Sequence, residues 1–208
     1  MYKDITGIIL SGGKSQRMGV NKSFLPFGSV TIIEHMLNLM KSVFEDNILI
    51  TNEPESYERF NIPTYPDIYK NIGPLGGIHS GLSASSTEKN FVISCDIPMM
   101  TKEIIQFISD YQSSAKIIVA KADGFIQQLC GVYNRSCLTM AEDIIKHSLE
   151  QETRDVMQVK RKCKVLTLLD VVGAEIIDIE KECKDYKSGA YFNINKPEDY
   201  QKIQGFLQ

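Results

Sequence analysis

Short apolar runs alternate with amphipathic helical patterns through the first two thirds of the chain. A strand-like run at residues 6–10 precedes a helical pattern at residues 31–44, and another strand-like run follows at residues 47–51. Neighbouring parallel strands need a crossover connection, which is usually a helix. The alternation therefore predicts an α/β fold, a Rossmann-like three-layer sandwich with a mainly parallel central sheet and helices on both faces.

The rest of the chain continues this pattern. Further strand-like runs lie at residues 62–65, 90–94, 116–120, 129–133, 165–169, 176–179 and 192–195. Helical patterns lie at residues 76–83, 102–111, 138–148 and 197–206. No linker composition, repeat or low-complexity segment interrupts them, so we expect one domain over residues 1–208.

Composition narrows the class of protein. The 208 residues are 43% hydrophobic and 24% charged, a mixture typical of globular proteins with a sizeable core. A formal net charge of -3 argues against nucleic acid or an anionic membrane as the main partner. Five scattered cysteines without C-x-x-C spacing indicate reduced thiols. Without a signal-peptide pattern or a membrane-length apolar stretch, a cytoplasmic protein is expected.

The most informative single segment follows the first strand-like run and reads LSGGKSQRMGVNK over residues 10–22. Its glycines allow successive main-chain N–H groups to point at one anion, and Lys14, Arg17 and Lys22 add positive charge. Long loops in compact domains are usually functional or disordered. The segment therefore favours a polyphosphate-binding loop, and a solvated surface loop is the alternative.

Two familiar phosphate-binding motifs do not fit this segment. A Walker A loop would need a glycine where Ile8 stands, counted back from Gly13. A dinucleotide fingerprint needs G-x-G-x-x-G at the start of a helix, whereas no helical pattern begins directly after Gly19. Neither a P-loop nor a dinucleotide-binding site is predicted.

Polar residues and a glycine follow four of the predicted strands. They are Ser11 and Gly12 after the first strand, Asn52 after the second, Asp67 after the third and Asp96 after the fourth. In open α/β sheets, ligands bind in the crevice outside the carboxyl ends of the strands. We therefore expect these five residues to share one crevice.

Asp96 is the first candidate for a metal ligand. It ends an apolar strand within Cys95-Asp96-Ile97-Pro98, where its carboxylate could bind Mg²⁺ while substrate phosphates complete the coordination. The alternative is that Asp96 caps the following helix, although Thr101 is better placed for that role.

Asn193 and Asn195 are a second candidate pair. In an extended segment their side chains share one face, so both could assist a metal or a ligand. Asn195 could instead cap the last helix, with Glu198 at the third helical position. The sequence leaves both interpretations open.

Residues 73–82, GPLGGIHSGL, predict a turn that continues as a helix of small residues. Such a helix permits either close approach of a base or ribose or tight packing on the sheet, and both can hold. His35, His79 and His147 have no metal-ligand spacing, and no Ser-His-Asp or Cys-His arrangement can be argued.

Taken together, these motifs resemble a known family. Residues 10–22 resemble the loop L-[AS]-G-G-x-S-x-R-M-G-x-x-K of nucleotidyltransferases with a GT-A-type fold, the nucleotide-diphospho-sugar transferase type. Residues 73–78, 95–98 and 193–199 are similar to the later motifs of the molybdenum cofactor guanylyltransferases of the MobA type. The motifs stand in the expected order over nearly the full length, but residues 125–164 match weakly.

The resemblance implies transfer of GMP from GTP to molybdopterin, or to its molybdenum-loaded form, with release of pyrophosphate. It implies Mg²⁺ as cofactor and, as partners, other proteins of molybdenum cofactor biosynthesis, with the enzyme itself expected as a monomer. The implied nucleotide-binding residues are Leu10, Ser11, Gly12, Gly13, Lys22, Asn52, Asp67 and Asp96. Lys22, Arg17 and Asp96 would be catalytic, and Asp96 and Asn195 would hold the metal.

The chemistry agrees with these roles. The nucleophile, a phosphate monoester oxygen, is already anionic at neutral pH, so no protein base is required. Catalysis then consists of aligning two phosphates and neutralising their charge with Mg²⁺, Lys22 and Arg17. A carboxylate such as Asp67 could accept both N–H groups on the Watson–Crick edge of guanine, a donor pair that cytosine lacks.

Two other functions compete with this one. The nearest is another small nucleotidyltransferase, such as a molybdopterin cytidylyltransferase. The other is a nucleotide-binding regulatory module that lost turnover, against which Lys22 and Asp96 both count.

Overall fold

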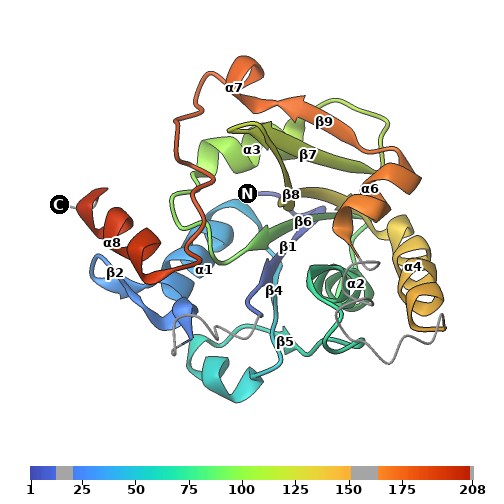
Figure 1. Cartoon of the computed structure of the whole chain (residues 1–208), viewed down its shortest axis with the longest axis horizontal. Helices are drawn as coiled ribbons and strands as arrows, with labels where there is room; N and C mark the ends of the chain where they lie inside the picture. Colours follow the sequence, from blue (N-terminus) through green and yellow to red (C-terminus); the bar gives the residue numbers. More distant parts are fainter. Residues whose placement is uncertain (13–20, 151–163, 207–208) are drawn as a thin grey trace.

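A seven-stranded sheet forms the centre of the molecule (Figure 1). The computed structural model describes residues 1–12, 21–150 and 164–206. The strands are β1 (Ile5–Leu10), β4 (Asn47–Ile50), β5 (Thr64–Tyr65), β6 (Lys89–Ser94), β7 (Ile117–Ala122), β8 (Phe125–Asn134) and β9 (Glu175–Asp178). Their order is β5-β4-β1-β6-β8-β7-β9, and only β8 runs antiparallel to its neighbours. The predicted mainly parallel sheet is confirmed.

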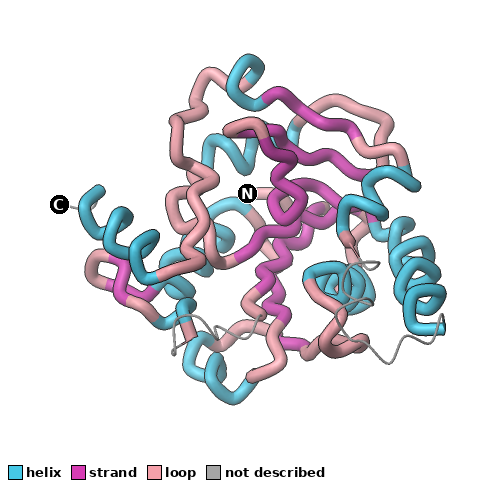
Figure 2. The backbone as a smooth tube through the Cα atoms, viewed as in Figure 1, coloured by secondary structure: helices cyan, strands magenta, loops and turns pink. Residues whose placement is uncertain are grey.

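Helices cover both faces of the sheet, which confirms the three-layer sandwich (Figure 2). Helices α1 (Ile32–Val43) and α3 (Lys102–Asp110) pack on one face, whereas α2 (Pro74–Ala84), α4 (Leu138–Glu150) and α6 (Val165–Val172) pack on the other. Successive side chains of the fully buried β1 alternate between the two faces, with Ile9 on the first and Ile8 and Leu10 on the second.

Local sequence signals set several helix boundaries. Thr31 and Glu34 form a capping box at the start of α1, and the Thr101 side chain accepts a hydrogen bond from Ile104 N at the start of α3. Both satisfy N–H groups that a helix leaves unpaired at its first turn. Helix α2 begins after Gly73, whose φ of 93° is one that glycine adopts without strain.

Two sequence predictions of strands were wrong. Residues 165–169 belong to helix α6, because Val165, Leu168 and Leu169 have helical spacing and turn together into the core. A short apolar run cannot distinguish a buried strand from a buried helix. Residues 192–195 are not part of the sheet, and Ile194 N instead donates to Asp96 O at 2.9 Å.

The C-terminal segment returns to the N-terminal third of the chain. Helices α7 (Ile179–Glu182) and α8 (Pro197–Phe206) follow β9, and the bounds of α8 are those predicted. Tyr200 Oη and Gln204 Nε2 both donate to Pro26 O, which belongs to a ribbon formed by β2 (Pro26–Phe27) and β3 (Val30–Thr31). None of the described helices is long and apolar enough to cross a membrane.

Candidate functional site

Four neighbouring parallel strands, β5, β4, β1 and β6, end at one edge of the sheet. Asp67, Asn52, Ser11 with Gly12, and Asp96 follow these strands in that order across the edge. The edge spans three strand spacings, about 14 Å in all. The structure therefore places the five residues along one edge, as the sequence predicted.

Lys22 and Asp96 form the central contact of the site. Lys22 lies in the 3-10 helix η1 (Lys22–Phe24), and its Nζ donates to Asp96 Oδ2 at 2.7 Å and to Ile194 O at 2.9 Å. Ser94 Oγ donates to the other carboxylate oxygen, Oδ1, at 2.6 Å. The two charged side chains are only 20% and 17% exposed, so water screens their attraction less than on an open surface.

The oxygens around Lys22 Nζ form a donor set suited to magnesium. Asp96 supplies a carboxylate and Ile194 a main-chain carbonyl, and both already point at a cation. Such hard oxygen donors, completed by substrate phosphates and water, are what Mg²⁺ prefers. The described residues contain no cluster of three or more His, Cys, Asp or Glu side chains able to hold a metal by themselves. Asp96 therefore fits a metal shared with a phosphate ligand.

In the described part of the chain, Asp199 rather than Asn195 makes the side-chain hydrogen bonds at the start of helix α8. Asp199 Oδ2, in the first turn, accepts from the main-chain N–H groups of the two preceding residues, Asn195 and Lys196, at 3.0 and 2.9 Å. The Asn195 side chain is exposed, whereas Asn193 Nδ2 donates to Tyr191 O at 3.1 Å. Metal binding by Asn195 stays a prediction.

Asn52 and Asp67 hold each other at the other end of the edge. Asn52 Nδ2 donates to Asp67 Oδ2 at 2.7 Å, and Asp67 N donates to Asn52 Oδ1 at 3.2 Å. Burial raises the pKa of the Asp67 carboxyl, against an opposing effect of the Asn52 hydrogen bond. Gly77 in α2 lies beside Asp67, since a Cβ there would be in ordinary contact with Asp67 Oδ1 at 3.7 Å.

In the described part of the Gly-rich loop, the main-chain groups that a ligand could reach are mainly those of Gly12. Leu10 O accepts from Cys95 N and Ser11 N donates to Ile50 O, so both groups are used within the sheet. Among the described residues, no atom lies within 4 Å of a Cβ built on the exposed Gly12, so none of them keeps a ligand from its backbone. The predicted site residues Gly13 and Arg17, and Lys14 with them, lie outside the described residues.

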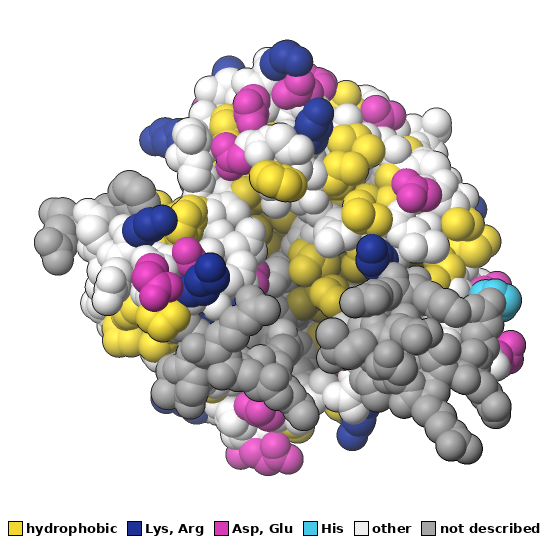
Figure 3. All heavy atoms as spheres, in the orientation of Figure 1, with side chains coloured by type: hydrophobic (Ala, Val, Ile, Leu, Met, Phe, Trp, Pro, Cys, Tyr) yellow, Lys and Arg dark blue, Asp and Glu magenta, His cyan; other side chains and the backbone are white. Residues whose placement is uncertain are grey.

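The surface around the site carries mixed charge. Figure 3 shows Lys or Arg and Asp or Glu side chains interspersed over this face, which is hollowed near its centre with hydrophobic side chains on the wall of the hollow.

All four described cysteines, Cys95, Cys130, Cys137 and Cys183, are free and buried. The fifth, Cys163, lies outside the described residues.

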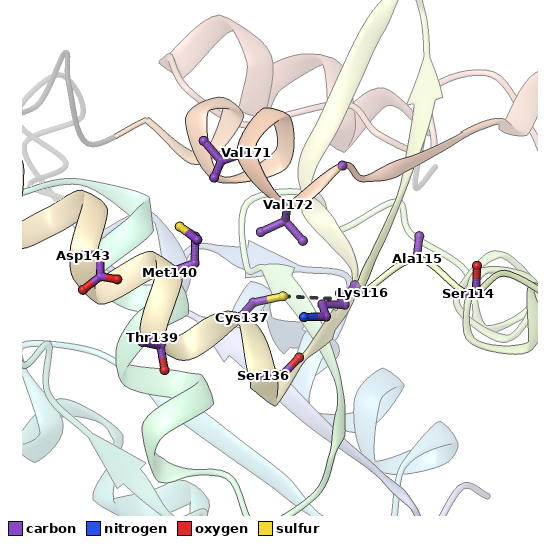
Figure 4. Close-up of a pocket in the computed structure, with 11 residues that line it drawn as sticks. Ser114, Ala115, Lys116, Ser136, Cys137, Thr139, Met140, Asp143, Val171 and Val172 are labelled. Carbon is purple, nitrogen blue, oxygen red and sulfur yellow. Dashed lines mark hydrogen bonds between the residues drawn. The ribbon is translucent and has the colours of Figure 1, made fainter.

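A separate cavity of about 500 Å³ lies at the opposite edge of the sheet. Lys116 and Gly173 line it and precede β7 and β9, which run in the same direction as β1, so the cavity lies at the amino ends of the strands. Figure 4 shows Met140 of α4 and Val171 of α6 on its walls. It contains none of the site residues predicted from the sequence.

The fold and the polar residues at its carboxyl edge define an α/β nucleotidyltransferase. Residues 7–164 match the MobA-like NTP transferase domain, and the chain belongs to this family. A probable molybdenum cofactor guanylyltransferase from Carboxydothermus hydrogenoformans is 32% identical over 97% of this chain and 95% of its own. A molybdenum cofactor guanylyltransferase from Desulfosudis oleivorans is 29% identical over 98% of this chain and 96% of its own length.

A solved structure shows the same fold. Molybdopterin-guanine dinucleotide biosynthesis protein A from Archaeoglobus fulgidus superposes with a TM-score of 0.77 over 97% of both chains, at 20% sequence identity. Sequence reasoning found the Lys22 and Asp96 side chains but missed Ser94 and Ile194 O, which hold them. A main-chain carbonyl cannot be recognised from the residue type. Ser94 could have been found, because a serine two residues before Asp96 in a strand shares its face and can donate a hydrogen bond to it.

Proposed function

We propose that this protein transfers GMP from GTP to molybdopterin, or to its molybdenum-loaded form, forming the guanine dinucleotide cofactor and releasing pyrophosphate. The observation that carries the proposal is the contact of Lys22 with Asp96 and Ile194 O at the strand edge that also bears Gly12. Relatives about 30% identical over nearly their whole length, named for this activity, support it.

The reaction needs alignment and charge neutralisation more than proton transfer. A phosphate monoester oxygen of the pterin attacks the α-phosphorus of GTP, the bond to the β-phosphate breaks, and pyrophosphate leaves with the electron pair. Lys22 lies where its ammonium can exchange a carboxylate partner for phosphate oxygens. Because negative charge moves onto the leaving group, a fixed cation stabilises the transition state.

Asp96, with the Ile194 carbonyl beside it, would hold the magnesium ion. When bound, Mg²⁺ would neutralise triphosphate charge and orient the leaving group. Ser94 keeps the Asp96 carboxylate in one orientation through its 2.6 Å hydrogen bond to Oδ1. A hydrogen bond from a neighbouring side chain to a metal-binding carboxylate holds that carboxylate in the rotamer that binding requires.

Asp67 and Asn52 would bind guanine at the other end of the edge. Asn52 occupies Asp67 Oδ2, so Oδ1, which has no hydrogen bond among the described residues, can accept from the guanine base. Cytosine lacks the paired N–H donors of guanine, and a site built on polar contacts discriminates strongly against a base that leaves them unmet.

A thermal-shift panel tests the base preference. GTP, CTP, ATP and UTP are each added with Mg²⁺, and the melting temperature is measured at several concentrations. A ligand that binds only the native state raises the melting temperature according to its affinity. GTP is expected to give the largest rise. An equal rise with CTP would contradict the guanylyl assignment and favour a cytidylyltransferase.

A pyrophosphate-release assay with molybdopterin separates an enzyme from a regulatory module. Release that requires both GTP and the pterin is expected. GTP binding without any release would support the regulatory module instead.

A further inference from the structure

A buried cluster of hydroxyl and thiol groups lies next to the segment that carries Lys22. Its members are Ser11 after β1, Ser23 in η1, Cys95 after β6, and Tyr57 in the 3-10 helix η2 (Pro54–Phe60). Ser11 Oγ lies 2.8 Å from both Ser23 Oγ and Tyr57 Oη, and Ser23 Oγ lies 3.2 Å from Cys95 Sγ. Each of the four residues is at most 4% exposed.

One assignment of hydrogens satisfies the whole cluster. Asn21 Nδ2 donates to Tyr57 Oη at 3.3 Å, so the Tyr57 hydroxyl donates to Ser11 Oγ. Ser11 then donates to Ser23, Ser23 donates to Cys95 Sγ, and Cys95 Sγ donates back to Ser11 Oγ at 3.3 Å. A fully satisfied buried network specifies one arrangement of its segments.

The cluster fixes the main chain on both sides of Lys22. Asn21 Oδ1 accepts from Ser23 N at 3.1 Å, and the Asn21 side chain contacts the Tyr57 hydroxyl. Ser23, directly after Lys22, is bonded to Ser11 and Cys95 at the ends of two central strands. A lysine side chain is a flexible four-carbon stem, so its ammonium stays at one place only when its main chain is fixed.

We propose that Tyr57 is a positioning residue for Lys22, acting through its hydroxyl and the Ser11 and Ser23 hydroxyls. The inference rests on the proposed nucleotide site, but not on the identity of the base or of the acceptor. The Tyr57 ring packs on Phe24 at 5.0 Å and on Phe60 at 6.3 Å between centroids. Tyr57→Phe therefore keeps the ring contacts and removes only the hydroxyl.

The test is a double-mutant cycle of Tyr57→Phe with Lys22→Ala. Affinity for the nucleoside triphosphate is measured by calorimetry with Mg²⁺, and kcat and KM are measured by pyrophosphate release. Tyr57→Phe alone is expected to weaken binding roughly three- to tenfold, the effect of one lost hydrogen bond. In the Lys22→Ala background the same substitution should change affinity by less than about twofold, since Lys22 carries its effect.

Tyr133→Phe is the matched control. Tyr133 is also fully buried, and its hydroxyl donates to Gln128 O at 2.6 Å on the other face of the sheet. It should lower the melting temperature as Tyr57→Phe does, yet leave nucleotide affinity unchanged. Loss of affinity in proportion to lost stability in both tyrosine variants would assign Tyr57 a purely structural role.

Two further outcomes would overturn the proposal. One is an equal loss of affinity with and without Lys22, and the other is no loss in Tyr57→Phe alone. If Tyr57→Phe folds poorly, Ser23→Ala replaces it in the same cycle with the same criteria. The cycle uses whichever nucleotide the wild-type protein binds best. A wrong guanine assignment would therefore appear as a different preferred nucleotide, and a wrong role for Tyr57 as missing coupling.

Discussion

At the scale of single residues, the site depends on a contact between positions far apart in the sequence. Lys22 and Asp96 are 74 residues apart, and Ile194, which shares the Lys22 ammonium, is 172 residues from it. The ammonium is held by oxygens that also suit a divalent cation. Binding of Mg²⁺ and a triphosphate would therefore give Lys22 and Asp96 new partners rather than leave either charge unpaired.

Asp96→Asn should reduce turnover by at least about a hundredfold while the fold survives. The substitution removes the anionic oxygen that would anchor Mg²⁺ but keeps nearly the same shape. Pyrophosphate release and the circular dichroism spectrum measure the two effects. Asp143→Asn, on the exposed side of α4, is the control and should behave as wild type. Near-normal release by Asp96→Asn would remove Asp96 from the catalytic residues.

The preference for GTP should weaken as the pH falls through the pKa of Asp67. Burial raises this pKa in the folded state, so the carboxyl takes up its proton at a higher pH than an exposed aspartate does. Protonation removes the negative charge that makes Oδ1 a strong acceptor for the guanine N–H groups. The ratio of CTP to GTP dissociation constants, measured between about pH 4 and pH 7, should therefore fall on acidification.

Asp67→Asn should lose this pH dependence and bind GTP roughly tenfold or more weakly. The stability of the folded protein depends on pH in the opposite direction to GTP binding. Because the raised pKa favours the protonated form in the folded state, ionised Asp67 lowers stability as the pH rises from the unfolded pKa to the folded one. Asp67→Asn should thus not lower the melting temperature at neutral pH. An unchanged pH profile in the variant would assign the titration to another group.

At the scale of elements, small residues bring helix α2 close to the sheet beneath the site. A Cβ on Gly81 would lie 2.6 Å from Ile8 Cγ2, and a Cβ on Gly77 would lie 3.3 Å from Leu10 Cδ2. Both glycines are buried and face the central strand. The structure thus confirms tight packing for this glycine-rich helix, and close approach of a base to it stays a prediction.

Gly81→Ala should destabilise the protein by about 1–3 kcal/mol, because the added methyl group overpacks the core. The measurement is the midpoint of denaturant unfolding. Gly205→Ala is the matched control in helix α8, where a Cβ would meet no atom of the described residues within 4 Å. It should be neutral or slightly stabilising, since alanine is the better helix former. Equal destabilisation by both variants would mean that helix propensity, not contact with Ile8, decides the effect.

Element predictions succeeded where the sequence contained both a period and a boundary signal. Thr31, expected at the start of the first helix, caps α1, and Thr101, expected as a helix cap, caps α3. Pro197 begins α8. Residues 165–169 lacked such signals before them, and their apolar run suited a buried strand and a buried helix equally. Gly173, with φ of 75°, ends that helix and was the available signal.

At the scale of the whole molecule, strand order assembles the site. The order β5-β4-β1-β6 brings four strand ends together, although they are spread over residues 10–94. Positional reasoning predicted this edge because parallel strands end on the same side. It could not predict Ile194 O, which contacts Lys22 in the segment just before α8, a helix that itself hydrogen-bonds to Pro26 O of β2. Neither could it predict Tyr57, which reads as an ordinary core aromatic.

The most direct test of the central claim is product formation by the wild-type protein. The protein is incubated with Mg²⁺, molybdopterin and either GTP or CTP labelled at the α-phosphate, and the pterin products are separated by chromatography. Label from GTP, but not from CTP, is expected to enter a pterin dinucleotide in an amount equal to the pyrophosphate released. Labelled dinucleotide from CTP at the same rate, or none from GTP, would contradict the central claim.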